Sequence, residues 1–313
     1  MKKQVAAPVV TVGSFDGVHC GHRVLLQQVV DLAHQNACRS VVLTFATHPR
    51  MLLDVSTPAR WLLNTPEEKV EFLSQCGIDD VVMLPFDHEM AQMSATDFVR
   101  NIMVEKLHTQ YWVVGEDHSF GKDKSGNAEN ISSLTKSFQI EIVKVNLKEC
   151  ECESGGNEQK SFAGKISSSA IRQLLLEGNL EPANRMLGYP YPISGTVVSG
   201  NQLGRTIGFP TANIEPAPFK LLPKDGVYAV KIRLGDENLA GMMYIGKRPV
   251  LKKQEQEPHI EAHIFDFDRD IYGQHLHLSI THRIRDDMAF DNMEQLQTQL
   301  KHDKRTVKQL FAV

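Results

Sequence analysis

Two histidines three residues apart, His19 and His22, stand where a predicted strand gives way to a predicted helix. The stretch "GSFDGVHCGH" (13–22) follows the apolar run 9–12 and leads into an apolar-periodic segment that begins near Val24. A glycine-rich strand-to-helix turn offers backbone N–H groups and the positive end of a helix, and both favour phosphate. Both rings can point to one side and stabilise charge on a phosphoryl group undergoing displacement. A metal pair and two ordinary polar turn residues are the alternatives.

A second candidate site lies in "GRTIGFPTAN" (204–213), in the other half of the chain. Gly208 allows a tight turn, and Pro210 stiffens the backbone beside Thr211 and Asn213. The hydroxyl and amide oxygens of the last two residues suit a hard cation such as Mg²⁺, shared with substrate phosphates. On composition alone the stretch also fits an ordinary surface loop.

The elements that must position these residues differ between the two halves of the chain. Residues 1–187 alternate short apolar runs with helical periodicity, which is typical of a parallel sheet covered on both faces. From the proline-rich "GYPYP" (188–192) on, residues 190–285 form short, roughly alternating segments with turn signals between them, which is typical of an antiparallel barrel or sandwich. We therefore predict an α/β half followed by an all-β half.

Apolar runs and helical periodicity predict the individual elements. Strands are expected at 8–13, 40–45, 80–86, 111–115, 140–145, 192–200, 226–235, 239–246, 260–267 and 276–285. Helices are expected at Val24–Ala33, Pro66–Cys76, Ala95–Leu107 and from Asn292 to Phe311. A further helix is expected in 167–179 after a serine cap, and a short one follows it and ends at Leu187. Asp291 and Glu294 are the expected capping pair of the last helix.

Composition limits the class of protein. The chain has 313 residues, of which 42% are hydrophobic and 23% charged, and a net charge of −4. These values are typical of a globular protein with packed cores, and they favour neither a nucleic acid nor a membrane surface as partner. The five cysteines are odd in number and scattered, so we expect a reducing, cytoplasmic compartment. Nothing in the sequence indicates an oligomeric state.

The motifs, in this order, resemble one enzyme family. "GSFDGVHCGH" is similar to the H-x-G-H signature of nucleotidylyltransferases that use ATP, and "TFATHP" (44–49), "VGEDHSFGKDKSGN" (114–127) and "KISSSAIR" (165–172) match further segments of such enzymes. "GFPTAN" resembles the hallmark of riboflavin kinases, as do "DGVYAV" and "IEAHIFDFDRDIYG". The chain is thus identified as a member of the bacterial bifunctional riboflavin kinase/FMN adenylyltransferases, also called FAD synthetases.

This resemblance implies a fold and two consecutive reactions. The implied fold is a Rossmann-like nucleotidylyltransferase domain with a parallel sheet (1–187) and a riboflavin-kinase-type antiparallel β-barrel with a C-terminal helix (188–313). The implied reactions are phosphorylation of riboflavin to FMN and adenylylation of FMN to FAD with release of pyrophosphate. Riboflavin, FMN, FAD and ATP are the expected partners, with ATP as co-substrate and Mg²⁺ as cofactor.

The resemblance also implies roles for residues of the first half. His19 and His22 would hold ATP phosphates and stabilise the developing charge as the FMN phosphate attacks the α-phosphorus. Ser168, Ser169 and Arg172 would hold the departing β,γ-phosphates, and a serine-capped helix with an arginine is a sensible anion site. The other residues expected to bind ATP phosphates are Gly13, Phe15, Asp16, Gly17 and Gly21.

In the second half, Thr211 and Asn213 are expected to bind the metal and ATP phosphates, with Gly208 and Pro210 in the same phosphate-binding loop. Glu261 would be the general base that accepts the proton of the riboflavin 5′-hydroxyl as that oxygen attacks the γ-phosphorus of ATP.

The period of the predicted strand at 260–267 places Glu261 and His263 on one polar face, with apolar neighbours on the other. Asp117 and Arg285 are expected to bind flavin because they match flavin-side positions of the family.

Two departures from the family's N-I-G-x-R-P-T motif define an alternative function. Tyr244 replaces asparagine and Val250 replaces threonine, which would favour an FMN adenylyltransferase with an impaired kinase half. A flavin-binding regulator without turnover is a second alternative. A different H-x-G-H transferase is a third, but it would leave the second half of the chain unexplained.

Overall fold

The computed structural model describes residues 7–54, 56, 58, 60–115, 119–122, 125–127, 130–146, 166–200, 203–246 and 259–312. Contacts divide the chain into two compact units. The first unit comprises Met1–Pro58 and Leu62–Ser168, and the second comprises Ala59–Trp61 and Ser169–Val313. The functional boundary between 187 and 188 stays a prediction.

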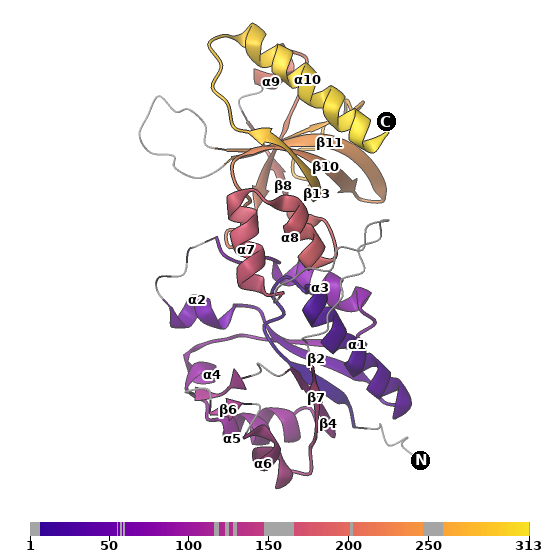
Figure 1. Cartoon of the computed structure of the whole chain (residues 1–313), viewed down its shortest axis with the longest axis vertical. Helices are drawn as coiled ribbons and strands as arrows, with labels where there is room; N and C mark the ends of the chain where they lie inside the picture. The colour runs from indigo at the N-terminus through magenta and orange to yellow at the C-terminus, as the bar shows by residue number, and fades with distance from the viewer. Residues whose placement is uncertain are drawn as a thin grey trace. The chain divides into compact units, whose positions relative to one another are not determined.

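A parallel sheet forms the centre of the first unit (Figure 1). Its described strands lie in the order β3-β2-β1-β4-β7, and neighbouring strands are parallel throughout. They are β1 (Val9–Val12), β2 (Ser40–Phe45), β3 (Asp80–Leu84), β4 (Tyr111–Gly115) and β7 (Glu141–Val145). The predicted parallel sheet is confirmed, and β1 lies in the middle of it, between β2 and β4.

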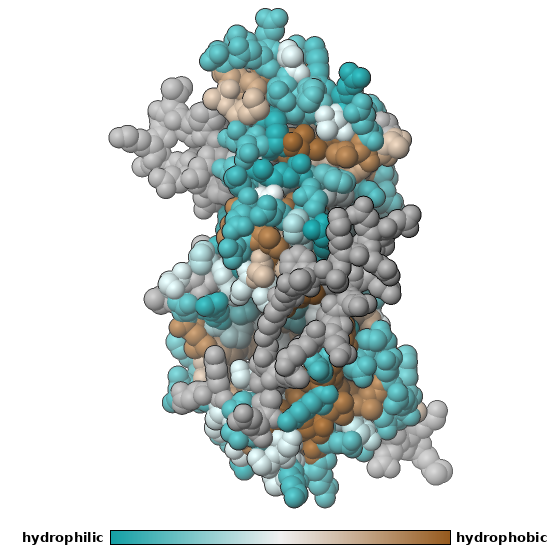
Figure 2. Space-filling view, in the orientation of Figure 1, coloured by the Kyte–Doolittle hydropathy of each residue, from teal (hydrophilic) through white to brown (hydrophobic). Residues whose placement is uncertain are grey.

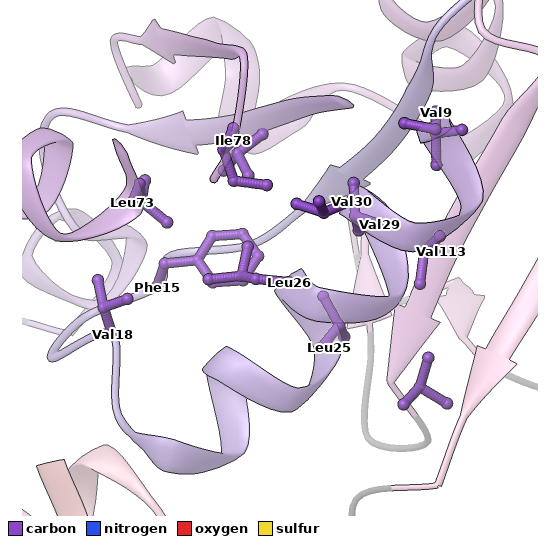
Figure 3. Close-up of a cluster of buried hydrophobic side chains, with 13 residues drawn as sticks. Val9, Phe15, Val18, Leu25, Leu26, Val29, Val30, Leu73, Ile78 and Val113 are labelled. Carbon is purple, nitrogen blue, oxygen red and sulfur yellow. The ribbon is translucent and has the colours of Figure 1, made fainter. Parts of the chain in front are cut away.

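Both faces of the central strands β1, β2 and β4 are buried, which explains why these strands lack polar alternation. One cluster of buried side chains contains Val9 with Leu26 of α1 (Cys20–Gln35) and Leu73 of α3 (Pro66–Gln75), and Figure 3 shows it. A second cluster on the other face contains Val10. Successive residues of β1 therefore point into different cores.

The helices of the first unit largely follow the predicted periodicity. The helix expected over Ala95–Leu107 begins as α5 (Ala95–Phe98) and continues as the π-helical turn η1 (Val99–Val104). Elements that the periodicity did not predict are α2 (Pro49–Leu53), α4 (His88–Gln92), α6 (Ile131–Lys136) and the short strands β5 (Ser119–Phe120) and β6 (Gly126–Asn127). They are short, so a hydrophobic period has too few turns to show itself.

A closed barrel forms the centre of the second unit. Its described strands follow the order β10-β11-β12-β9-β8-β13, and each pairing is antiparallel. They are β8 (Tyr191–Val198), β9 (Ala212–Pro216), β10 (Gly226–Leu234), β11 (Glu237–Gly246), β12 (His259–Ile264) and β13 (His275–Asp286). The predicted barrel is confirmed, but β9 falls where the sequence indicated a loop.

Helices accompany the barrel in the second unit. They are α7 (Ser168–Glu177), α8 (Leu180–Leu187), α9 (Leu203–Thr206) and α10 (Met293–Phe311). The expected capping pair of α10 was wrong by one residue: Asn292 is the N-cap and accepts from the Gln295 N–H, while the Gln295 side chain accepts from the Asp291 N–H. An Asn side chain has the same short acceptor as Asp, so the pattern alone did not separate the two positions.

The visible face in Figure 2 is mostly hydrophilic, with hydrophobic residues in separate patches. Exposed large apolar side chains come from distant parts of the chain, among them Leu53, Phe219 and Met288. Throughout the described ranges, no helix combines the length and hydropathy that crossing a membrane requires.

An ion pair with a buried carboxylate attaches α10 to the barrel, and its removal should destabilise the second unit. The Asp303 side chain is fully buried and accepts from Arg285 Nε at 2.9 Å. We expect Asp303→Ala to lower the free energy of unfolding by about 3 kcal/mol, because it leaves the mostly buried Arg285 guanidinium without its carboxylate. Urea unfolding followed by circular dichroism measures this change.

The matched control is Asp266→Asn, which removes an exposed ion pair between Lys308 of α10 and the turn after β12. We expect this variant to unfold close to the wild-type midpoint, because solvent screens the pair. Equal losses in the two variants would contradict the assignment of the Asp303 carboxylate as the main ionic attachment.

Candidate functional site

The first candidate site is the turn that joins β1 to α1, and its backbone is strained. Phe15 (φ 44°), Gly17 (φ 90°) and Val18 (φ 32°) all lie in the left-handed region. This conformation is uncommon for Phe and an outlier for a β-branched residue such as Val, and it costs about 1–3 kcal/mol per non-glycine residue. Such strain persists only where the surrounding structure holds it, and it clusters at ligand-binding turns.

His19 and His22 stack at the start of α1. His19 is the N-cap, and its Nδ1 accepts a hydrogen bond from the His22 backbone N–H at 3.3 Å. The two ring centroids are 3.6 Å apart, with 13° between the planes. The first turn of α1 contains no acidic residue, so no carboxylate within it offsets the positive end of the helix dipole. The two rings therefore share one side, as the spacing predicted.

Burial favours the neutral form of the His22 ring, and one nitrogen of this ring is unsatisfied. Burial first, and then the charges of His19 and Lys69, lower the pKa of His22 well below 6.5. Its Nδ1 is buried and finds no hydrogen-bond partner within the part of the chain that the structure describes. Buried polar atoms are rarely left unpaired, so this nitrogen indicates a place where a ligand completes the hydrogen bonding.

Two residues expected to bind phosphate have side chains that serve the structure. The Phe15 ring lies in the core cluster with Leu26 (Figure 3) and packs edge-on to His22, with centroids 5.3 Å apart. The Asp16 carboxylate is buried and accepts from the backbone N–H groups of Leu63, at 3.0 Å, and Asn64, at 3.2 Å. Any contact of these two residues with phosphate would therefore come from the backbone.

The serines and the arginine of "KISSSAIR" fall on both sides of the boundary between the units. Ser168 belongs to the first unit, and its hydroxyl donates to the Asp16 carbonyl at 2.8 Å. Ser169 is exposed. Arg172, in the second unit, is buried, donates from Nε to the Trp61 carbonyl at 2.9 Å and has its guanidinium 3.3 Å from the Trp61 ring centroid.

Lys69 of α3 is a residue that the sequence reasoning missed. It is only 4% exposed, and its Nζ donates to the Phe45 carbonyl, 2.9 Å away at the end of β2. Burial lowers the pKa of Lys69 from 10.5 to about 8, although the charge of Asp16 opposes this change. Keeping the ammonium charged at neutral pH therefore costs ~3 kcal/mol relative to an exposed lysine. Its position four residues before the buried Leu73 was a signal that it faces inward.

The second candidate site is built where β9 pairs with β12. Asn213 lies opposite Glu261 in the antiparallel register. The Thr211 hydroxyl donates to Glu261 Oε2 at 3.1 Å, and His259 Nε2 donates to Asn213 Oδ1 at 2.6 Å. Thr211, Asn213 and Glu261 thus bring hydroxyl, amide and carboxylate oxygens together, as the motifs suggested.

His263 completes this face of β12, but it does not lie on a solvated polar face as expected. It is buried, donates from Nδ1 to the Pro210 carbonyl at 2.8 Å and packs against the rings of Phe209 and Phe265. Gly208 takes φ 78°, which allows the preceding turn. The strand period was right, whereas the expected exposure was wrong, because the ring of Phe209 from another segment and the ring of Phe265 just after β12 pack against His263.

The predictions for the flavin side stay predictions, and the structure describes the surroundings of only some of these residues. Arg285 is held by Asp303, and its Nη1 donates to the Asp286 carbonyl at 3.0 Å. Tyr244 lies opposite Glu261 in the β11–β12 register, and burial, followed by the charge of Asp287, raises its pKa. Two predicted positions, Asp117 and Val250, lie outside the described residues.

A parallel sheet with a histidine pair at a helix start and a barrel with grouped oxygen side chains are typical of the class of phosphoryl- and nucleotidyl-transferring enzymes. Comparison with known proteins narrows this class. Residues 1–155 match the family model of FAD synthetase, and residues 187–311 match that of riboflavin kinase. The chain belongs to the bifunctional riboflavin kinase/FMN adenylyltransferase family.

Curated relatives and a solved structure extend along nearly the whole chain. The bifunctional riboflavin kinase/FMN adenylyltransferase of Listeria monocytogenes is 36% identical, covering 97% of this chain and 92% of the relative, and that of Escherichia coli K12 is 35% identical, covering 97% and 93%. A crystal structure described as a macrolide-efflux protein from Streptococcus pneumoniae is 32% identical, covers 97% of this chain and 94% of its own, and has a TM-score of 0.82.

The lowered pKa of His22 predicts how acid affects the first unit. When the pH lies between the pKa of His22 in the folded chain and its unfolded value of 6.5, His22 is protonated in the unfolded chain but not in the folded chain. Stability is therefore lost as pH falls below 6.5, by up to about 1.4 kcal/mol per pH unit from this group. We expect His22→Gln to lose less stability than wild type between pH 7 and pH 5 in urea unfolding.

The matched control is His34→Gln, at an exposed position on the same helix. It should show the wild-type dependence on pH. Identical pH dependence in wild type and His22→Gln would mean that His22 is not held neutral by the fold.

Proposed function

We propose that this chain makes FMN from riboflavin in its second unit and FAD from FMN with its H-x-G-H site, consuming ATP in each step. The observation that carries the proposal is the contact between Thr211 and Glu261 in a chain whose first unit presents the stacked His19–His22 pair. Riboflavin, FMN, FAD and ATP are the small-molecule partners.

In the kinase step, Glu261 accepts the proton of the riboflavin 5′-hydroxyl as that oxygen forms a bond to the γ-phosphorus of ATP. The bond from the γ-phosphorus to the β,γ-bridging oxygen breaks, and ADP leaves. A carboxylate within hydrogen-bond reach of the nucleophile is a suitable base. The pairing of β9 with β12 supports this role, because it holds Glu261 against Thr211.

The donor set of the kinase site fits Mg²⁺. The Thr211 hydroxyl, the Asn213 amide oxygen and the Glu261 carboxylate are hard oxygen ligands, which this cation prefers. Thr211 and Asn213 would hold the ion, and when bound it would neutralise charge on the ATP phosphates. His259 orients the amide by donating to Asn213 Oδ1, and His263 fixes the loop by donating to the Pro210 carbonyl.

In the adenylylation step, an FMN phosphate oxygen forms a bond to the α-phosphorus of ATP. The bond to the β-phosphate breaks, and pyrophosphate leaves without a covalent enzyme intermediate. His19 and His22 offer their rings at the positive end of α1, where charge on the phosphates develops. Ser168, Ser169 and Arg172 are the groups that we propose for the departing pyrophosphate.

Several finer assignments also belong to the proposal. Asp117 and Arg285 stay proposed flavin-side residues; because Asp303 holds the Arg285 guanidinium, Arg285 would act by fixing the segment after β13. A cytoplasmic location is supported by the thiols Cys38 and Cys76, which form no disulfide in the described structure.

Separate variants should block the two steps separately. We expect Glu261→Gln to slow FMN formation from riboflavin by about 10²- to 10⁴-fold, because it removes the base, while FAD formation from added FMN continues. We expect His22→Gln to slow FAD formation by about 10²- to 10³-fold, while FMN formation continues. Chromatographic separation of flavins after incubation with ATP and Mg²⁺ measures both rates.

His19→Asn is the matched control for the helix start, because asparagine keeps an N-cap acceptor and loses the imidazole. It should fold like wild type and still lose FAD formation. The proposed function fails if wild type produces neither FMN from riboflavin nor FAD from supplied FMN.

A further inference from the structure

Lys69 is a buried cation at the edge of the parallel sheet where ligands bind. Its Nζ contacts the last residues of β2, at 2.9 Å from the Phe45 carbonyl and 3.5 Å from the Thr44 hydroxyl. Thr44 in turn donates to the Ser14 carbonyl at 3.2 Å, in the turn after β1. Ligands of open α/β sheets bind beyond the carboxyl ends of the strands, so the ammonium lies at the binding edge.

No carboxylate pairs with this ammonium among the described residues within 4.0 Å. The charge of Asp16 raises the pKa of Lys69 without forming an ion pair, and the Asp16 carboxylate accepts from the backbone N–H groups of Leu63 and Asn64. A buried charge without an ion-pair partner is costly, and well-packed hydrophobic residues in place of buried ionic groups are often neutral or stabilising. The positive charge is therefore only partly balanced within the described residues, and an anionic ligand could complete the balance.

Lys69 and His22 are close enough to affect each other electrostatically, because the Lys69 charge contributes to keeping His22 neutral. Two groups thus lie near each other: a buried ammonium that forms no ion pair in the described structure, and a buried His22 Nδ1 without a hydrogen-bond partner there. A polyphosphate satisfies both, since it is an anion with many oxygen atoms. A carboxylate ligand would carry less charge for the same space.

We propose that Lys69 is a positioning residue of the adenylyl-transfer site, whose buried ammonium supplies a fixed positive charge that holds polyphosphate against the histidine pair. The inference rests on the proposed adenylylation function. Lys69 acts through the field that it exerts at His22 and through its hold on the end of β2. The ligand class is a di- or triphosphate, as ATP brings it and as pyrophosphate leaves.

The test replaces Lys69 with methionine, which has almost the same length and no charge. We expect Lys69→Met to raise the dissociation constant of inorganic pyrophosphate about 10-fold and to lower kcat/KM for FAD formation from FMN about 10²-fold. We also expect a weaker dependence of pyrophosphate affinity on salt, because a charge at the site is lost. Calorimetric titration with pyrophosphate and flavin chromatography measure these changes.

Stability distinguishes this role from a structural one. Removing an unpaired buried charge should leave the thermal midpoint unchanged or raise it, whereas a lysine that only ties α3 to β2 would lower the midpoint and leave pyrophosphate affinity untouched. Pyrophosphate affinity of Lys69→Met equal to that of wild type overturns the proposal, whatever the midpoint. Lys69→Arg, which keeps the charge, should bind pyrophosphate more tightly than Lys69→Met does.

The Lys69 test has two controls, one control variant and one control reaction. Lys136→Met removes a charge from an exposed position in the first unit and should match wild type in every assay. FMN formation from riboflavin, measured in the same Lys69→Met preparation, should be unchanged because the kinase residues belong to the second unit. Wild type that binds pyrophosphate but forms no FAD would refute the proposed function, and the pyrophosphate titration would still decide the role of Lys69.

Discussion

The buried carboxylate of Asp16 is the constraint on which the first unit depends. The carboxylate oxygens accept from the backbone N–H groups of Leu63 and Asn64 just before α3 begins. The backbone carbonyl of Asp16 accepts from the Ser168 hydroxyl. One residue in the turn after β1 thereby fixes the start of a helix about 50 positions later and a serine about 150 positions later. The strained turn can persist because these contacts hold it from several sides.

In the second unit, the register between β12 and β9 holds the candidate site in place. Alternate residues of β12 hold the segment before and within β9: His263 contacts Pro210, Glu261 contacts Thr211 and His259 contacts Asn213. A one-residue slip would turn this face of β12 away and dismantle the site, so the closure of the barrel also fixes the chemistry. Sites placed on strands in this way are more rigid than sites on loops alone.

The first unit gives up stability where the chemistry is proposed. In the first unit, Val18 takes an unfavourable backbone conformation, His22 is desolvated with an unpaired nitrogen, and Lys69 is buried without an ion pair among the described residues. Each of these features is unfavourable in the absence of ligand and would be offset by binding phosphate. Local departures from the rules of good packing are expected at functional sites, and here they occur close together along one edge of one sheet.

Local patterns in the sequence determined much of this protein. The apolar runs predicted the parallel sheet, and the spacing of His19 and His22 predicted that their rings share one side, because strand and helix periods are properties of a few neighbouring residues. Only the tertiary structure decided that Phe15 turns into the core, that His263 is buried and that Lys69 reaches the end of β2. These outcomes depend on which distant segments cover a side chain, and no short window of sequence contains that information.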